Sequence, residues 1–190
     1  MPGLNANAQA FEAAVAPWER QVYFTCLRIM GNRQDAEDCA QEAMLKAYQA
    51  FSGFRGESKV STWLYTIAAR CCMDALRRRR EMVSLDNLRE VGWEAESDEP
   101  SPYLQLEQAE RRRLLGEAIA RLPAEHRLVL TLCDLQGMSY EEAARALDCA
   151  LGTVKSRLSR ARAGLKQLLT ADGELFHDNM RPMDEGRESK

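Results

Sequence analysis

Basic side chains suited to binding phosphate groups gather between Thr153 and Leu169. The apolar residues of this stretch recur every three or four positions, which is one face of an α-helix. No acidic residue lies between Thr153 and Thr170, and the polar face carries Lys155, Ser156, Arg157, Ser159, Arg160, Arg162 and Lys166. Lysine and arginine bind phosphate oxygens and base edges, so this face is suited to contact nucleic acid.

A second helical pattern, from Ser139 to Asp148, precedes the basic one and is separated from it by the four residues CALG. Two such helices joined by a tight turn form a helix-turn-helix, whose second helix enters the DNA major groove. Thr153 is a suitable N-cap for the second helix. Asp148 stands at the turn, where glycine is common, and it fits this position because aspartate tolerates the left-handed conformation. A basic helix face can also be a solvated surface. A small Ala144 at the expected helix crossing and an apolar Val154 in the first turn favour DNA binding.

Net charge and apolar runs narrow the classes of protein to which this chain can belong. The 190 residues have a net charge of −3 and a sequence pI of about 5.6, which excludes a binder that relies on overall positive charge. No apolar run reaches the roughly 20 residues that cross a membrane, and the first residues lack the pattern of a signal peptide. We therefore expect a cytoplasmic protein without direct membrane insertion.

The six cysteines form no C-x-x-C pair, and no histidine stands at metal-ligand spacing from them. We expect them to be small buried side chains of a reducing compartment and expect no metal and no cofactor. A redox or metal-sensing role for the cysteines stays open.

Every periodic segment before the basic helix is also helical. The stretches 9–30, 33–51 and 60–80 carry apolar stripes at helical spacing, and Gly31 with Asn32 provides a helix stop. A loop with two glycines, 52–59, precedes the third stretch, in which Ser61 is a possible N-cap.

The second half of the chain begins with an acidic segment, 81–102, whose composition predicts a flexible linker. Helical patterns follow from 103 to 122 and from 124 to 135, and Pro123 breaks the helix between them. The prediction is an all-α fold of two small domains, 1–80 and 103–170, with a disordered tail at 171–190.

Four stretches in this order resemble an extracytoplasmic-function (ECF, group 4) sigma factor of bacterial RNA polymerase. They are DAEDCAQEAMLKAY (35–48), FRGESKVSTWLYTIAARCCMDALRRRR (54–80), LPAEHRLVLTL (122–132) and MSYEEAARALDCALGTVKSRLSRAR (138–162). The resemblance implies that the first domain corresponds to sigma region 2 and the second to region 4. Its implied partners are the polymerase core (the clamp helices of the largest subunit, and the flap), promoter DNA and an anti-sigma factor.

The resemblance also implies residue roles in the first domain. The polar face of the second helix would bind the clamp helices through Asp35, Asp38, Gln41 and Glu42. The loop that captures a flipped minus-10 base corresponds to Phe54, Arg55, Gly56, Glu57, Ser58 and Lys59. Arg70 and Asp74 would contact minus-10 bases, and phosphates would bind Arg77, Arg78, Arg79 and Arg80.

In the second domain, the resemblance implies that the helix-turn-helix reads the minus-35 element. The residues expected to contact bases are Lys155, Ser156, Ser159 and Arg160. Phosphates would bind Arg157, Arg162 and the helix N-terminus at Thr153.

The chain departs from the family at Arg70, where many relatives have asparagine, so its minus-10 preference is expected to differ. Trp63 and Tyr65 invite comparison with the aromatic residues that melt DNA in housekeeping sigma factors. Apolar spacing favours Trp63 as a core residue and leaves Tyr65 undecided.

Two other functions fit parts of the sequence. A regulator that uses the helix-turn-helix without polymerase would bind a palindrome as a dimer, but no long heptad pattern supports a dimer. A helical nuclease would need a catalytic site, but His126 and His177 are isolated from any acidic pair at metal-binding spacing. We expect no catalytic residues.

Overall fold

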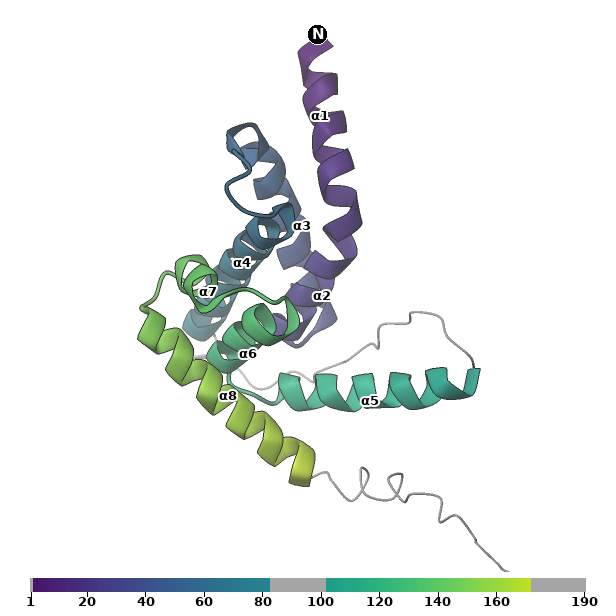
Figure 1. The fold of residues 1–190 in the computed structure, drawn as a ribbon, viewed down its shortest axis with the longest axis vertical. Helices are drawn as coiled ribbons and strands as arrows, with labels where there is room; N and C mark the ends of the chain where they lie inside the picture. The colour runs from purple at the N-terminus through teal and green to yellow at the C-terminus, as the bar shows by residue number, and fades with distance from the viewer. Residues whose placement is uncertain (1, 83–101, 172–190) are drawn as a thin grey trace, which may run out of the picture.

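The computed structural model describes residues 2–82 and 102–171, and all regular elements in these ranges are helical (Figure 1). The first range holds α1 (Pro2–Val15), η1 (Ala16–Trp18), α2 (Glu19–Met30), α3 (Arg33–Ala50), η2 (Phe51–Gly53) and α4 (Val60–Met82). The second holds α5 (Pro102–Ala120), α6 (Ala124–Leu130), the π-helical turn η3 (Thr131–Leu135), α7 (Tyr140–Ala146) and α8 (Leu151–Ala171). The predicted all-α fold is confirmed. Most of the expected linker and nearly all of the expected tail lie outside the described residues.

Local sequence explains where the first helices end. Gly31 ends α2 in the left-handed conformation, with φ of 77° and its N–H bonded to the Leu27 carbonyl oxygen. Asn32 then caps α3, because its side chain accepts a hydrogen bond from the Asp35 N–H.

The expected unbroken helix from residue 9 to 30 is wrong. Pro17 lies in a short 3₁₀ turn between α1 and α2, where its missing N–H and its ring interrupt the helix.

Two expected N-caps are also wrong, because both helices begin earlier. The Trp63 N–H bonds to the Lys59 carbonyl oxygen, so α4 begins at Val60 and Ser61 lies inside it. The Thr153 N–H bonds to the Ala150 carbonyl oxygen, so α8 begins at Leu151 and Thr153 lies in its first turn.

The N-terminal helices form a bundle in which α2, α3 and α4 pack on one another. Its buried centre is rich in small side chains, which let the helix backbones approach closely: Cys26, Ala36, Cys39, Ala43, Ala47, Ala68, Ala69, Cys71 and Cys72. Five of the six cysteines are buried, and Cys149 is partly exposed. Within the described residues, no group of three or more His, Cys, Asp or Glu side chains could hold a metal ion.

The C-terminal helices form a second group around α8, which packs against α5, α6 and α7. Its buried residues include Val129, Leu132, Ala143, Val154, Leu158 and Ala161. Gly164 allows α8 to pass close to the end of α5, since a Cβ atom there would lie 3.1 Å from Cδ2 of Leu122.

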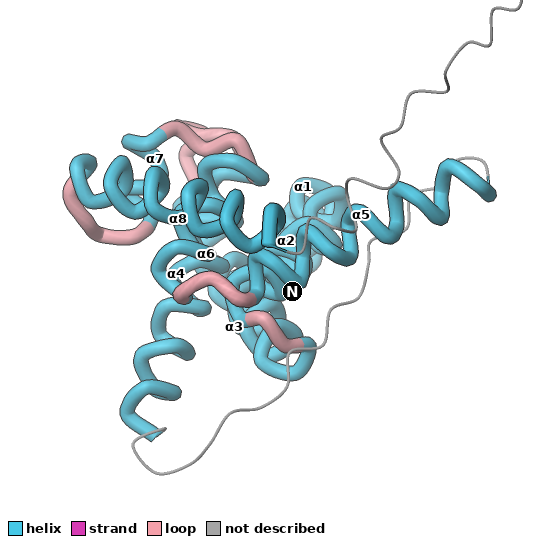
Figure 2. The backbone as a smooth tube through the Cα atoms, turned by 90° about the horizontal axis from the view of Figure 1, so that it is seen from below, coloured by secondary structure: helices cyan, strands magenta, loops and turns pink. Residues whose placement is uncertain are grey.

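The two helical groups are in contact. The helices α5 and α6 pack against α2, and α7 packs against α4 (Figures 1 and 2). The buried residues of both groups form one continuous cluster. The domain boundaries expected from the sequence stay a prediction. In the described ranges, no helix is both long and apolar enough to cross a membrane.

Candidate nucleic-acid interface

The second helix of the helix-turn-helix presents the basic face that the sequence predicts. Val154, Leu158 and Ala161 are at most 1% exposed, and they hold α8 against the other helices of its group. The helix is thereby fixed in rotation, and its opposite face is exposed at Lys155, Ser156, Ser159 and Arg160. Within the described residues, neither Lys155 nor Arg160 has an acidic partner, so both charges are available to a ligand.

The turn before this helix is held by two specific features. Ser139 and Glu142 form a capping box at the start of α7, because each side chain bonds to the other residue's backbone N–H. Asp148 has a φ of 48°, the left-handed conformation expected at this position. These features set the angle at which α8 leaves α7.

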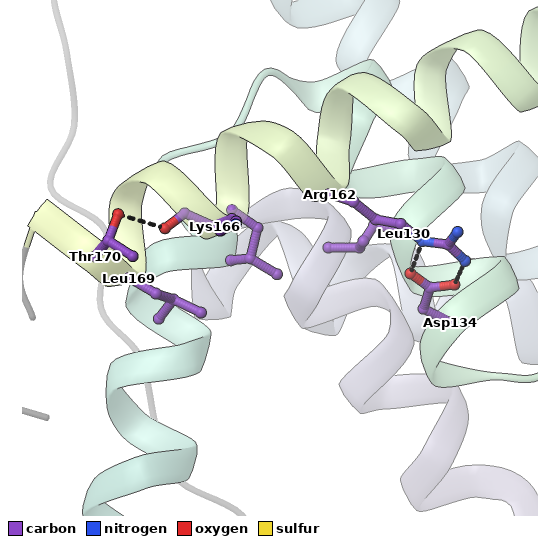
Figure 3. Close-up of a pocket in the computed structure, with 7 residues that line it drawn as sticks. Leu130, Asp134, Arg162, Lys166, Leu169 and Thr170 are labelled. Carbon is purple, nitrogen blue, oxygen red and sulfur yellow. Dashed lines mark hydrogen bonds and ion pairs between the residues drawn. The ribbon is translucent and has the colours of Figure 1, made fainter.

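Arg157 and Arg162 lie beside the exposed face, and each has an acidic partner within the chain. Nη2 of Arg157 is 2.7 Å from Oε2 of Glu125 in α6. Arg162 makes a two-point ion pair with Asp134, with Nε–Oδ2 and Nη2–Oδ1 distances of 2.9 and 2.5 Å (Figure 3). The hydrogen bonds from Asp134 raise the pKa of Arg162. These two arginines anchor α8, and their expected contacts with phosphates stay a prediction.

An open pocket of about 400 Å³ lies between the end of α8 and the α6–η3 segment. Its lining is mainly apolar, with the Arg162–Asp134 pair at one end, as Figure 3 shows. The lining residues are Leu130, Asp134, Arg162, Leu165, Lys166, Leu169 and Thr170. No pattern in the sequence indicates this pocket.

The loop before α4 is anchored at one end and exposed at the other. The Phe54 ring packs on Trp63, with 4.8 Å between ring centroids, whereas Arg55 to Lys59 are exposed. Gly56 has a φ of 71°, which other residues rarely adopt.

Trp63 packs against the core, as expected. Tyr65 is only 5% exposed, and burial raises the pKa of its hydroxyl, so it is a core residue and not a surface aromatic.

The predicted DNA-contacting residues of α4 differ in exposure. Arg70, Asp74, Arg77 and Arg78 are exposed, Arg79 is half-buried, and Arg80 lies in the same helix. Arg79 Nη1 is 3.3 Å from Asp35 Oδ2, and Arg78 Nη2 is 3.7 Å from Glu42 Oε2. The structure therefore brings Arg78 and Arg79 of α4 beside acidic residues of α3, although the sequence predicts two separate surfaces.

The polar face of α3 is the expected surface for the polymerase core. Asp38 and Gln41 are exposed, whereas Asp35 and Glu42 are half-buried. A hydrogen bond from Lys46 lowers the pKa of Glu42, so its carboxylate stays charged. Leu45 on the same face is 58% exposed and is not among the residues predicted to bind the polymerase core. Leu45 lies outside the apolar stripe of the helix, and this position in the sequence indicates that its side chain is exposed.

Two helical groups, one ending in a helix-turn-helix with an exposed basic face, define a DNA-binding protein with two functional parts. Residues 14–82 match the family Sigma-70 region 2, and residues 112–165 match Sigma-70, region 4. The chain is 35% identical over 169 residues to the RNA polymerase sigma-H factor of Pseudomonas aeruginosa, covering 86% of this chain and 88% of the relative. It is 34% identical over 167 residues to the ECF RNA polymerase sigma-E factor of Escherichia coli K12, covering 84% and 86%.

Two solved structures have the same fold. The sigma factor RpoE of Bartonella quintana, solved in complex with the anti-sigma factor NepR, gives a TM-score of 0.68 at 28% identity, covering 86% of this chain and 99% of that one. CnrH, solved in complex with the cytosolic domain of CnrY, gives a TM-score of 0.56 at 26% identity, covering 87% of this chain and 90% of that one. The chain belongs to the extracytoplasmic-function group of the sigma-70 family. It binds RNA polymerase core, recognises promoters and directs transcription initiation.

Proposed function

We propose that α8 reads the minus-35 element with the exposed face formed by Lys155, Ser156, Ser159 and Arg160. The observation that carries this proposal is that burial of Val154 and Leu158 turns these four side chains outward together, with no acidic partner for Lys155 or Arg160 among the described residues. Lysine and arginine bind guanine edges, and serine bonds to several bases. Arg157, Arg162 and the first turn at Thr153 supply phosphate contacts at the margins of this face.

The minus-10 element is bound by α4 and the loop before it. The exposed residues Arg55 to Lys59 surround a captured base, and Gly56 keeps the backbone accessible to it. Arg70 and Asp74 contact bases, whereas the arginines from 77 to 80 contact phosphates. The ion pairs of Arg78 with Glu42 and of Arg79 with Asp35 hold these two arginines toward α3.

The polymerase core is bound through the α3 face of Asp35, Asp38, Gln41 and Glu42, extended by the apolar Leu45. Charged and amide side chains around one exposed leucine form a polar surface with a small apolar centre, as protein interfaces have. The protein acts in the cytoplasm, has no enzymatic activity, and serves a stress or signal regulon. An anti-sigma factor binds it, as solved relatives are bound by NepR and the cytosolic domain of CnrY.

Run-off transcription tests these roles. The purified chain and bacterial core polymerase are combined with a library of promoter fragments, and specific transcripts are expected only when both are present. Gln41→Ala should weaken binding to core, measured by co-elution on a sizing column, whereas Gln9→Ala, at an exposed position of α1, should not. An absence of transcripts together with an absence of core binding contradicts the proposal. The regulator that binds a palindrome without polymerase would then be tested next.

A further inference from the structure

Two carboxylates that are not among the predicted DNA or polymerase contacts hold the recognition helix α8. Glu125, in the first turn of α6, has Oε2 at 2.7 Å from Nη2 of Arg157. Asp134, in η3, accepts hydrogen bonds from Nε and Nη2 of Arg162 over 2.9 and 2.5 Å (Figure 3). The two acids lie near opposite ends of the α6–η3 segment, so this segment is tied to α8 at two points.

The two arginines lie on either side of the buried face of α8. Val154 is fully buried in that face. Because successive residues of a helix are turned by about 100°, Arg157 lies about 60° to one side of Val154 and Arg162 about 80° to the other. The opposite half of the helix carries the four residues proposed to read bases: Lys155, Ser156, Ser159 and Arg160. Each arginine therefore stands between the packed face and the reading face.

These two ties act on the rotation of α8 about its own axis. Hydrophobic burial is not directional and fixes the rotation only coarsely, whereas a guanidinium and a carboxylate joined at two points have a defined geometry. Rotation in either direction carries one arginine away from its carboxylate. A rotation of about 20° moves atoms about 5–6 Å from the axis by about 2 Å. Hydrogen bonds to base edges form over about 2.7–3.2 Å, so a displacement of this size breaks them.

The ion pairs leave both arginines able to bind phosphate. A guanidinium has five N–H donors. Asp134 accepts from two nitrogens of Arg162, and Glu125 contacts one nitrogen of Arg157. The Arg162 side chain is also 53% exposed. One arginine can therefore bond to a carboxylate of the chain and to a phosphate of the DNA together, and the carboxylate then sets where the phosphate contact falls.

We propose that Glu125 and Asp134 are positioning residues for promoter recognition, which fix the rotation of α8 through Arg157 and Arg162 and so determine how sharply the minus-35 sequence is read. This inference rests on the proposed role of the α8 face in reading minus-35. An exposed ion pair contributes little to stability, so the loss of either carboxylate should affect the choice of sequence more than the fold.

The test uses the full chain with core polymerase and two promoter fragments: one selected by the wild type, and the same fragment with its minus-35 stretch scrambled. Fluorescence anisotropy gives the Kd for each, and the ratio of the two Kd values measures the preference for the selected sequence. Asp134→Asn and Glu125→Gln each remove one carboxylate with little change of size. Glu141→Gln is the matched control, because Glu141 is exposed in the first turn of α7 and has no ion pair among the described residues. Circular dichroism checks that each variant is folded.

We expect Asp134→Asn to lower the preference by about 3- to 10-fold, which is part of the discrimination that well-placed base contacts give. Glu125→Gln should lower it less, because its ion pair has one contact and not two. The Kd for the scrambled fragment should not rise, since a negative charge beside the phosphates has been removed. Asp134→Glu keeps the charge and should restore the preference, and Glu141→Gln should leave it unchanged.

The inference is overturned if both acid variants keep the wild-type preference, or if Glu141→Gln lowers the preference as much as they do. Arg160→Ala, measured alongside, separates this result from a failure of the proposed function. A loss of preference with Arg160→Ala but not with the acid variants supports the reading face and removes the positioning role. A loss with the acid variants but not with Arg160→Ala supports the positioning role and contradicts Arg160 as a base contact. A wild type without any minus-35 preference contradicts both.

Discussion

Asp148 is the one residue other than glycine with a positive φ among the described residues, at 48°. This backbone conformation costs most residues about 1–2 kcal/mol of free energy. The cost is smaller for aspartate and absent for glycine. We expect Asp148→Gly to raise the free energy of unfolding by up to about 1 kcal/mol and Asp148→Val to lower it by about 1–2 kcal/mol. Urea unfolding measures both. A stabilising valine would mean that the turn does not hold this conformation in solution.

Thiol reactivity provides a second test at the scale of residues. Burial raises the pKa of Cys71 to about 11 and of Cys133 to about 11, so both stay protonated near neutral pH. The thiolate is the reactive form, and Cys149 is the only cysteine that is not buried. Brief treatment with iodoacetamide at pH 8, followed by mass spectrometry, should give one adduct per chain, at Cys149. Equally fast labelling at Cys72 would show that the bundle opens readily.

The exposed face of α8 was predictable from sequence, because spacing of three and four residues determines which side chains a helix buries together. The acidic partners of Arg157 and Arg162 could not be predicted from the sequence. Glu125 and Asp134 lie 32 and 28 residues earlier in the chain, and no local pattern connects them. The sequence therefore predicts phosphate contacts for both arginines but does not indicate the ion pairs that the structure shows.

At the scale of elements, α7 depends on its cap, since it has only seven residues and few internal hydrogen bonds. Ser139→Ala removes one half of the capping box, and we expect it to lower the free energy of unfolding by about 1 kcal/mol. Ser159→Ala, at an exposed position of α8, is the control and should be neutral or slightly stabilising, because alanine is the better helix former. Equal effects of the two substitutions in urea unfolding would contradict the role of the cap.

The sequence predicted the helical segments better than their boundaries. Gly31 and Asn32 are strong local signals and end α2 where expected. Pro17 was a signal of the same kind, but the apolar stripe on either side of it continues in phase, so periodicity alone suggested one helix. The helix α8 begins two residues before Thr153 because backbone bonds to Ala150 form without any side-chain cap.

At the scale of the whole molecule, the contact between the two helical groups could not be predicted. Its bonds join residues 75 to 111 positions apart, and most of the acceptors are backbone carbonyl oxygens. Every residue has such an oxygen, so the sequence gives no indication of which ones an arginine will reach. The two domains themselves were predictable, because a change to acidic composition separates two helical regions.

The isolated chain should bind promoter duplex poorly. Opening a duplex costs about 1.4 kcal/mol for each stacked step, and one captured base cannot supply this for a whole bubble. The polymerase must contribute the rest, so affinity for duplex should rise strongly when core is added. Fluorescence anisotropy with and without core measures this difference. Tight and specific duplex binding by the chain alone would contradict the expectation.

The most direct test of the residue assignments is run-off transcription from a library in which the minus-35 and minus-10 stretches are randomised independently, followed by sequencing of the templates used. Arg160→Ala removes a proposed base contact of α8 and should relax selection at minus-35 by about 10- to 100-fold, while selection at minus-10 persists. Lys166→Ala removes a charge from the same helix on the C-terminal side of these four residues and should leave the selected sequences unchanged. Selection at minus-35 that survives Arg160→Ala unaltered would contradict the assignment of this face as the reader.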